Sequence, residues 1–304
     1  APAANSFANT ISVDYDTIGD GDPASPDGRD YSESDDHIIA TVPTVDKRPI
    51  ASSFTETDSV DGSTPFALNI GEEVTFEYQI TLPEIEMESV VVSDTLPVGM
   101  QYVSFDVISF GAPPLTDTSD APLTDPTVTV SGQTVTFDFG DISNDFDGTI
   151  GPDDVITLQV TAVIVDNPAA VAGALLTNEV DVDVDPTGDD PFPTQEGSAD
   201  VVIVEPLLEL DKSGPLVVDT GDAIAYTLTV ENVGPPGGNA GPAYDVIVTD
   251  ALPPEFTLNT GSLLFQIDGT TITPTVTSDA TGFTASIPVL EPDEVLTVTY
   301  TADV

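Results

Sequence analysis

The sequence predicts an all-β protein made of tandem immunoglobulin-like β-sandwiches, and three observations carry this prediction. Apolar and polar residues alternate in many short runs, such as Val74–Ile80 and Ile224–Val230, and a period of two is typical of half-buried strands. Turn residues, 27 Pro and 23 Gly, separate these runs at short intervals, as in β-sandwiches. No stretch shows the apolar period of an α-helix.

An internal repeat divides the chain into domains. Three pairs of segments match in sequence: Asn69–Phe76 with Asp219–Tyr226, Val90–Pro97 with Val246–Pro253, and Gly151–Thr157 with Glu291–Thr297. The chain therefore holds two copies of one domain, and its 304 residues suffice for two separate cores. We expect the first sandwich over residues 43–204 and the second over residues 205–304.

A further match concerns the N-terminal segment. Asn178–Asp185, at the end of the first domain, is similar to Asn9–Asp16, whereas the second domain reaches Val304 without such a strand. Residues 1–42 therefore resemble the last strand and an acidic loop of a preceding repeat. We expect this strand to complete the second domain of a neighbouring unit, head to tail. The units are then consecutive stretches of one long protein or separate subunits.

The composition excludes several classes of function. Lys and Arg total 4 against 54 Asp and Glu, which gives a formal net charge of −50. This imbalance excludes nucleic-acid binding, which needs a basic face, and no apolar run predicts membrane insertion. The chain has no Cys, and its single His, His37, lies at an expected strand start. We therefore predict that it is not an enzyme.

The repeated motifs carry a resemblance to a known family. The runs GEEVTFEYQITLP with VVVSDTLPVGMQYVS, and GDAIAYTLTVENVG with VIVTDALPPEFTL, are similar to the conserved repeat domain of bacterial and archaeal surface proteins, the family called domain of unknown function eleven. The resemblance covers residues 43–304, although Thr81-Leu82-Pro83 departs from the pattern. It implies immunoglobulin-like sandwiches in stalks, adhesins or outer-layer proteins, and thus an extracellular or cell-surface location.

Clustered carboxylates predict calcium sites at the domain ends. Acidic side chains alternate along two matching strand ends and continue past glycine, namely Asp181, Asp183, Asp185 and Asp189 in one copy and Asp14, Asp16, Asp20 and Asp22 in the other. Like charges on one face are costly without a cation, and calcium takes 6–8 hard oxygen ligands. The alternative is an acidic loop that is merely solvated.

A second candidate calcium loop runs over residues 143–154. Its acids Asp145, Asp147 and Asp154 stand at positions three, five and twelve, with Gly148 at position six. This spacing follows the EF-hand loop, although position one is Ser143. An ordinary acidic turn is the alternative.

The only two lysines precede the first strand of each domain in matching places. Related surface domains join such a Lys to an Asn of the last strand by an intramolecular isopeptide bond, with the help of a buried acid. The resemblance thus implies two sets of candidate residues: Lys47, Asp94 and Asn178 in the first domain, and Lys212 and Asp250 with Asn9 of a neighbouring unit in the second. Such a bond needs a neutral amine and an acid that shuttles the proton. The alternative is that the acids cap turns and the lysines lie at the surface.

These observations together predict a structural role. We expect a repeat unit of an extracellular fibre, stalk or surface filament, which assembles head to tail with copies of itself or with adjacent repeats and is rigidified by calcium. The alternative is an adhesin of a large cell-surface protein, whose domains bind an unknown cell-surface ligand through a specialised loop.

Overall fold

The computed structural model describes residues 5–16, 28–39, 41–54, 66–188, 190–235 and 240–304, and for the first two of these ranges it describes the backbone alone. The regular secondary structure of the described residues consists of β-strands and one short 3₁₀ helix, Pro152–Asp154. The predicted all-β class with tandem immunoglobulin-like sandwiches is confirmed. Among the described residues, no helix is long and apolar enough to cross a membrane.

Domain one, which the sequence predicts over residues 43–204, has two sheets around one core. The first sheet has the strand order β3-β5-β10-β7 and the second the order β4-β12-β11-β6-β9-β8. Their strands are β3 (Thr44–Ser52), β4 (Phe66–Leu68), β5 (Glu73–Thr81), β6 (Glu86–Thr95), β7 (Met100–Phe110), β8 (Thr127–Ser131), β9 (Thr134–Ser143), β10 (Val155–Ile164), β11 (Leu175–Pro186) and β12 (Gln195–Ile203).

Domain two, residues 205–304, repeats this plan with fewer strands. Its sheets have the orders β13-β14-β20-β16-β17 and β15-β19-β18. The strands are β13 (Leu208–Ser213), β14 (Ala223–Asn232), β15 (Ala243–Ala251), β16 (Thr257–Ile267), β17 (Thr270–Ile272), β18 (Thr275–Asp279), β19 (Gly282–Leu290) and β20 (Val295–Asp303). By sequence match, β13, β14, β20 and β15 correspond to β3, β5, β10 and β6, and by sheet order β19 and β18 correspond to β9 and β8.

The alternation read from the sequence builds both cores. Phe76, Tyr78 and Ile80 of β5 are fully buried, as are Leu158 and Val160 of the adjacent β10, while the residues between them face outward. The same period-two pattern buries Leu228 and Val230 on β14, because successive side chains of a strand point to opposite faces.

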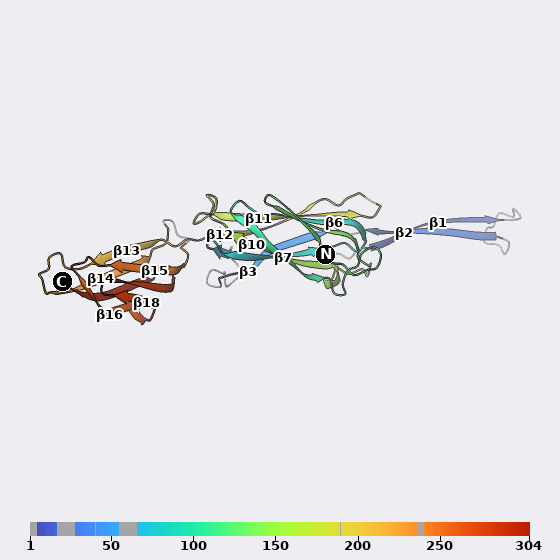
Figure 1. Ribbon diagram of the computed structural model, residues 1–304. Coiled ribbons are helices and arrows are strands. Elements are labelled where there is room, and N and C mark those ends of the chain that lie inside the picture. Colours follow the sequence, from blue (N-terminus) through green and yellow to red (C-terminus); the bar gives the residue numbers. More distant parts are fainter. Residues whose placement is uncertain (1–4, 17–27, 40, 55–65, 189, 236–239) are drawn as a thin grey trace.

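The N-terminal segment forms a separate two-stranded sheet. Strands β1 (Asn5–Asp16) and β2 (Gly28–Ile39) pair antiparallel along their whole length. In Figure 1 this hairpin extends from one end of domain one, and domain two lies at the opposite end. Within the single chain, domain one therefore separates the hairpin from domain two.

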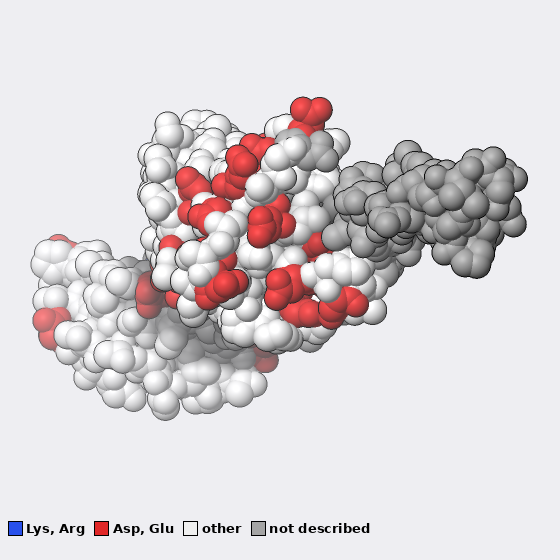
Figure 2. Space-filling model, turned by 90° about the vertical axis from the view of Figure 1, so that its right-hand side faces the viewer, with Lys and Arg blue, Asp and Glu red and all other residues white. Residues whose placement is uncertain are grey.

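Carboxylates occur in many separate places on the surface of domain one. Figure 2 shows Asp and Glu side chains spread over the face in view. Lys47 is buried instead of lying at the surface, and Arg48 pairs with Glu77 at 2.6 Å. Self-repulsion of so many like charges is relieved by salt or by bound cations.

Candidate assembly and crosslinking site

A buried ion pair crosses the core of domain one. Lys47 on β3 and Asp94 on β6 come from opposite sheets, and Lys47 Nζ lies 2.7 Å from Asp94 Oδ1 with both side chains fully excluded from solvent. Nζ also donates to the backbone oxygen of Glu179 at 3.1 Å. The ammonium group thus reaches β11, the strand that carries Asn178.

The carboxamide of Asn178 completes this cluster and is unusual. Asn178 is fully buried, yet neither its Nδ2 nor its Oδ1 has a hydrogen-bond partner among the described residues. Asp94 Oδ2 is also without such a partner. Because a buried polar group without a partner costs about 1–3 kcal/mol, its retention beside an amine and an acid requires an explanation.

Burial sets the electrostatics of this cluster. It lowers the pKa of Lys47 from 10.5 to about 8, although the Asp94 carboxylate acts in the opposite direction. Burial also raises the pKa of Tyr78 well above its ordinary value, and the Asp94 charge adds to this. Asp94 and Asn178 both lie near enough to perturb the Tyr78 hydroxyl, but neither forms a hydrogen bond of acceptable geometry with it. The neutral form of the Lys47 amine is therefore easier to reach in this cluster than in water.

Domain two repeats the lysine and the acid. Lys212 Nζ on β13 lies 2.7 Å from both carboxylate oxygens of Asp250 on β15, and Asp250 Oδ2 accepts a hydrogen bond from Tyr300. Burial and this hydrogen bond raise the pKa of Tyr300, so its hydroxyl remains a donor. The Lys212 ammonium also stands 4.9 Å from the ring centre of Tyr226. No asparagine corresponding to Asn178 lies on a described strand of this domain.

Three strands of domain one, β4, β11 and β12, have no counterpart among the described strands of domain two. In domain one, β6 lies between β11 and β9, whereas β15 pairs with β19 alone and its other edge is unpaired among the described strands. The buried residues along that edge are correspondingly less covered. Val246, Val248 and Asp250 retain 8%, 7% and 9% exposure, while the three matching residues Val90, Val92 and Asp94 are at 0%.

Two more apolar surfaces are uncovered in the same region. Leu210 on β13 is 69% exposed, while its counterpart Val45 packs against the core of domain one. Leu216 and Val217 are 101% and 86% exposed. Their counterparts in the repeat belong to β4, which is buried and pairs parallel with β12. All three uncovered surfaces, including the β15 edge, are those that β11 and β12 cover in domain one.

The β1–β2 hairpin has the same register as β11–β12. Asn9 of β1 pairs with Asp35, and Asn178 of β11 pairs with Ala199. With these pairs superposed, the run Asp36-His37-Ile38-Ile39 matches Asp200-Val201-Val202-Ile203. The backbone pairing thus extends the match from one strand, which the sequence showed, to a hairpin of two strands. Strand β12 has no counterpart in domain two either, and the sequence comparison missed this.

The second strand of the hairpin departs from its counterpart at some positions. Glu33 and His37 stand where domain one has Gly197 and Val201, and Val201 is fully buried. Strand β1 keeps the apolar row, because Ile11 and Val13 match Val180 and Val182. The match is therefore closer along β1 than along β2.

The carboxylates at the acidic end of β11 face solvent or accept an ordinary hydrogen bond. Asp181 and Asp183 are exposed and Asp185 is half-buried, and Asp183 accepts a hydrogen bond from Thr194. Asp189, Asp20 and Asp22 lie outside the described residues, and of Asp14 and Asp16 only the backbone is described. No group of three potential metal ligands forms among the side chains that the structure describes. The calcium sites therefore remain a prediction.

The loop 143–154 uses two of its acids to order the turn. Asp154 is buried and accepts hydrogen bonds from Asn144 Nδ2 and Gly151 N, at 2.9 and 2.6 Å. Asp147 accepts from the backbone and hydroxyl of Thr149, and Asp145 is exposed.

The same loop contains an acid that the sequence reasoning missed. Glu84, which precedes β6, is 1% exposed, and its Oε1 accepts from the backbone N–H of Asp147 and Gly148 at 2.9 Å. Its Oε2 has no hydrogen-bond partner among the described residues, and burial raises the pKa of Glu84. Because Glu84 lies some 60 residues before the loop, no local spacing could have found it.

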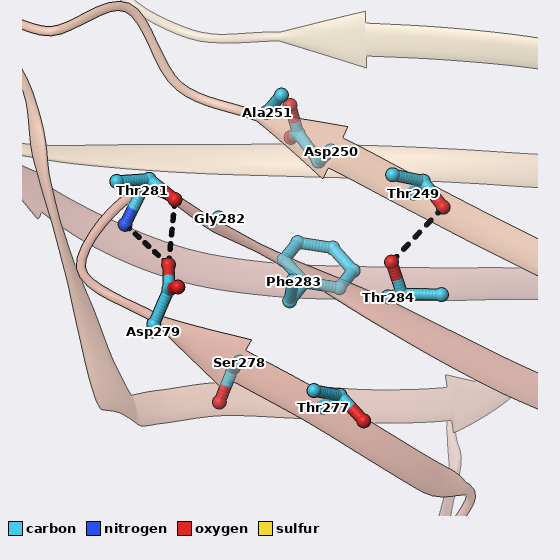
Figure 3. Close-up of a pocket in the computed structure, with 10 residues that line it drawn as sticks. All are labelled: Thr249, Asp250, Ala251, Thr277, Ser278, Asp279, Thr281, Gly282, Phe283 and Thr284. Atoms are coloured by element: carbon cyan, nitrogen blue, oxygen red, sulfur yellow. Dashed lines mark hydrogen bonds between the residues drawn. The ribbon is translucent and has the colours of Figure 1, made fainter.

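A shallow pocket lies beside Asp250, at the ends of β15, β18 and β19. Figure 3 shows a lining of hydroxyl side chains, Gly282 and the ring of Phe283, with Asp279 bound to Thr281. Its two carboxylates, Asp250 and Asp279, are both already hydrogen-bonded. We therefore assign no ligand to this pocket.

Comparison with known proteins gives similarities of fold only. No protein-family model matches the chain, and no curated protein matches it in sequence. Among solved structures, it is similar to the major pilin subunit BcpA of Bacillus cereus, with 13% identity, a TM-score of 0.38 and coverage of 94% of this chain and 95% of that one.

Two further pilins are similar to the same extent. A 35 kDa C-terminal fragment of the major pilin GBS80 of Streptococcus agalactiae gives 14% identity and a TM-score of 0.33, with 86% of this chain and 79% of that one covered. The T6 backbone pilin of Streptococcus pyogenes gives 12% and 0.34, with coverage of 86% and 68%. Scores this low support no argument about function.

Proposed function

We propose that this chain is a structural unit of an extracellular surface filament, in which units join head to tail. The β1–β2 hairpin of one unit enters domain two of the next and takes the places of β11 and β12. Each unit thus donates a hairpin at one end and accepts one at the other. Such a heterologous contact propagates as a filament unless it closes into a ring.

One observation carries this proposal: among the described strands, the β15 edge and the apolar surfaces beside it are uncovered, and the β1–β2 hairpin matches the two strands that cover the same surfaces in domain one. The unpaired β15 edge presents free backbone N–H and C=O groups, which template pairing with another strand. If β1 takes the place of β11, Val13 should lie opposite Val248 and Tyr15 opposite Val246, because the matching residues Val182 and Val184 pair with Val92 and Val90 in domain one.

The donated second strand accounts for the other uncovered surface. Val201 and Val202 of β12 pair parallel with Phe66 and Ala67 of β4. In the joint, His37 and Ile38 would pair in the same way with Leu216 and Val217, the most exposed large apolar residues of the described chain. Exposed apolar surface of this kind is characteristic of a binding site for another chain.

A covalent tie within domain one is the second part of the proposal. Lys47, Asp94 and Asn178 bring together an amine of lowered pKa, an acid and a carboxamide without a hydrogen-bond partner. An amide from Lys47 to Asn178 would remove the unpaired carboxamide and link β3 to β11. A force along the filament would then act on a covalently closed chain, instead of separating one strand from its sheet.

The third part of the proposal is that bound calcium makes the filament rigid. The buried Glu84 oxygen without a hydrogen-bond partner, next to Asp147, supports a cation at the loop 143–154. The acidic runs at the ends of β1 and β11 would lie near the junctions between domains. Divalent cations there would offset the repulsion among carboxylates.

The size of the assembly tests the proposed function. We expect the intact chain to form linear oligomers that lengthen with protein concentration, measured by light scattering and electron microscopy. Deletion of residues 1–42 removes the donor and should leave monomers with a folded domain one, since domain one contains its own β11 and β12. Deletion of residues 1–4 alone is the matched control. Equal assembly without the hairpin would contradict the proposal.

A further inference from the structure

We propose that the joint between two units is closed by a covalent amide bond from Lys212 of the accepting unit to Asn9 of the donating unit, with Asp250 as the proton-transfer group. This inference rests on the proposed function, because the carboxamide comes from a second copy of the chain. It adds that the units become linked covalently into a polymer without the help of an enzyme.

The arrangement in domain one gives the geometry of the completed site. Val180 pairs with Asp94 across the two strands, and Asn178 lies two residues before Val180 on β11. If β1 occupies the place of β11, Ile11 lies opposite Asp250. Asn9 then takes the place of Asn178, beside an amine and a carboxylate that are already 2.7 Å apart.

Domain two holds its half of the site in a prepared state. Lys212 approaches both oxygens of Asp250, and the Tyr300 hydroxyl donates to Oδ2. The rings of Tyr226 and Tyr300 flank the amine, 4.9 and 5.8 Å from their centres. Phe76 and Tyr78 flank Lys47 in the same way, although Tyr78 and Tyr300 come from different strands. Two aromatic rings therefore surround each lysine.

Docking of the hairpin removes the main difference between the two sites. The Lys212 side chain is 38% exposed and that of Lys47 is 0% exposed. The uncovered surfaces around Lys212 are those that β11 and β12 cover around Lys47. Burial disfavours the charged form of an amine, so the docked hairpin would itself promote the neutral, nucleophilic state.

The reaction is balanced without an oxidant, a reductant or a nucleotide. Proton transfer from Lys212 Nζ to Asp250 gives a neutral amine and a carboxylic acid, which hydrogen-bonds to Asn9 Oδ1. Nζ attacks Cγ of Asn9, and the Cγ–Nζ bond forms. Asp250 then carries a proton from Nζ to Nδ2, the Cγ–Nδ2 bond breaks, and ammonia leaves. Each joint therefore loses one ammonia, about 17 Da, which is the mass of the expelled group.

The experiment compares native assembly with resistance to denaturation. The intact chain should give a ladder of oligomers that survives boiling in dodecyl sulfate. Trypsin, which does not cleave after an acylated lysine, should release a branched product that joins Lys212 to the peptide containing Asn9. Asn9→Ala changes the hairpin alone and cannot unfold domain two. It should assemble natively yet dissociate fully in detergent.

Further variants separate the chemistry from the docking. Lys212→Met should also abolish the ladder of oligomers. Asn9→Asp can still react, with loss of water in place of ammonia, and should therefore retain the ladder with a correspondingly different mass. Native oligomers of the intact chain that dissociate in detergent at full sequence mass would overturn the covalent joint and leave the proposed function standing. An intact chain that never assembles would overturn both.

Discussion

A buried charge in the donated strand should break the joint, whereas the same charge one residue earlier should not. Val13 matches Val182, which is fully buried, and Ser12 matches Asp181, which is exposed. Val13→Asp forfeits about 2 kcal/mol of apolar burial and places a carboxylate against Val248. We expect a total loss of about 4 kcal/mol or more, because an unpaired buried charge costs several kcal/mol.

This loss corresponds to a joint weakened about a thousandfold. Ser12→Asp adds the same charge on the outward face and should change the affinity by less than about threefold, as surface substitutions do. Both variants are made in a chain that carries Asn9→Ala, so that sedimentation velocity measures a reversible equilibrium. Equal weakening by both variants, or stronger weakening by Ser12→Asp, would refute the predicted register, because a one-residue slip exchanges the two faces.

Four other predictions follow from the site. Asn178→Ala should prevent the amide bond between Lys47 and residue 178. For a closed loop of this length, the free energy of unfolding should fall by about 5 kcal/mol, measured as a lower melting temperature. The mass of domain one should then show no loss of ammonia. In that variant Lys47 remains a free amine, whose pKa burial lowers to about 8. The unfolded state then binds more protons than the folded state between about pH 8 and pH 10, so the free energy of unfolding should rise with pH by up to about 3 kcal/mol. Adding Lys47→Met should remove this pH dependence. Chelation of calcium at constant ionic strength should lower the melting temperature, and added calcium should restore it by mass action, whereas an unchanged melting curve would remove calcium from the account. His37→Val restores the buried valine of domain one and should tighten the joint about tenfold or more, with Ser34→Val on the opposite face as the control; weaker assembly of His37→Val would contradict the placement of β2.

The sequence alone was sufficient for the fold class and for the match between the two domains. Period-two alternation and turn residues are local signals, and the repeat compares the chain with itself. The Asn9 and Asn178 match also identified a strand that domain two lacks. The repeat could show this because it compares two copies strand by strand, and this comparison is the origin of the donated strand that we propose.

Other features depend on contacts that are distant in the chain. Strand β2 is more polar than β12, with Glu33 and His37 at inward-matching positions, so the sequence did not show that a whole hairpin is duplicated. The backbone register of the two hairpins showed this duplication. Tyr300 and Tyr78 approach their lysines from different strands, so the sequence comparison does not align them. Glu84 joins the loop 143–154 only through the fold.

Engineered cysteines test the head-to-tail hairpin most directly, because the chain has no Cys of its own. Thr95 pairs with Glu179 in domain one, so Thr10 of one unit should lie opposite Ala251 of the next. Two single variants, Thr10→Cys and Ala251→Cys, are mixed under mild oxidation and followed by mass. We expect a disulfide-linked heterodimer, since directly opposed strand residues approach within about 5.5 Å. The mismatched mixture of Asp14→Cys with Ala251→Cys should give almost none. Equal linkage by both mixtures, or none by the matched one, would contradict the account.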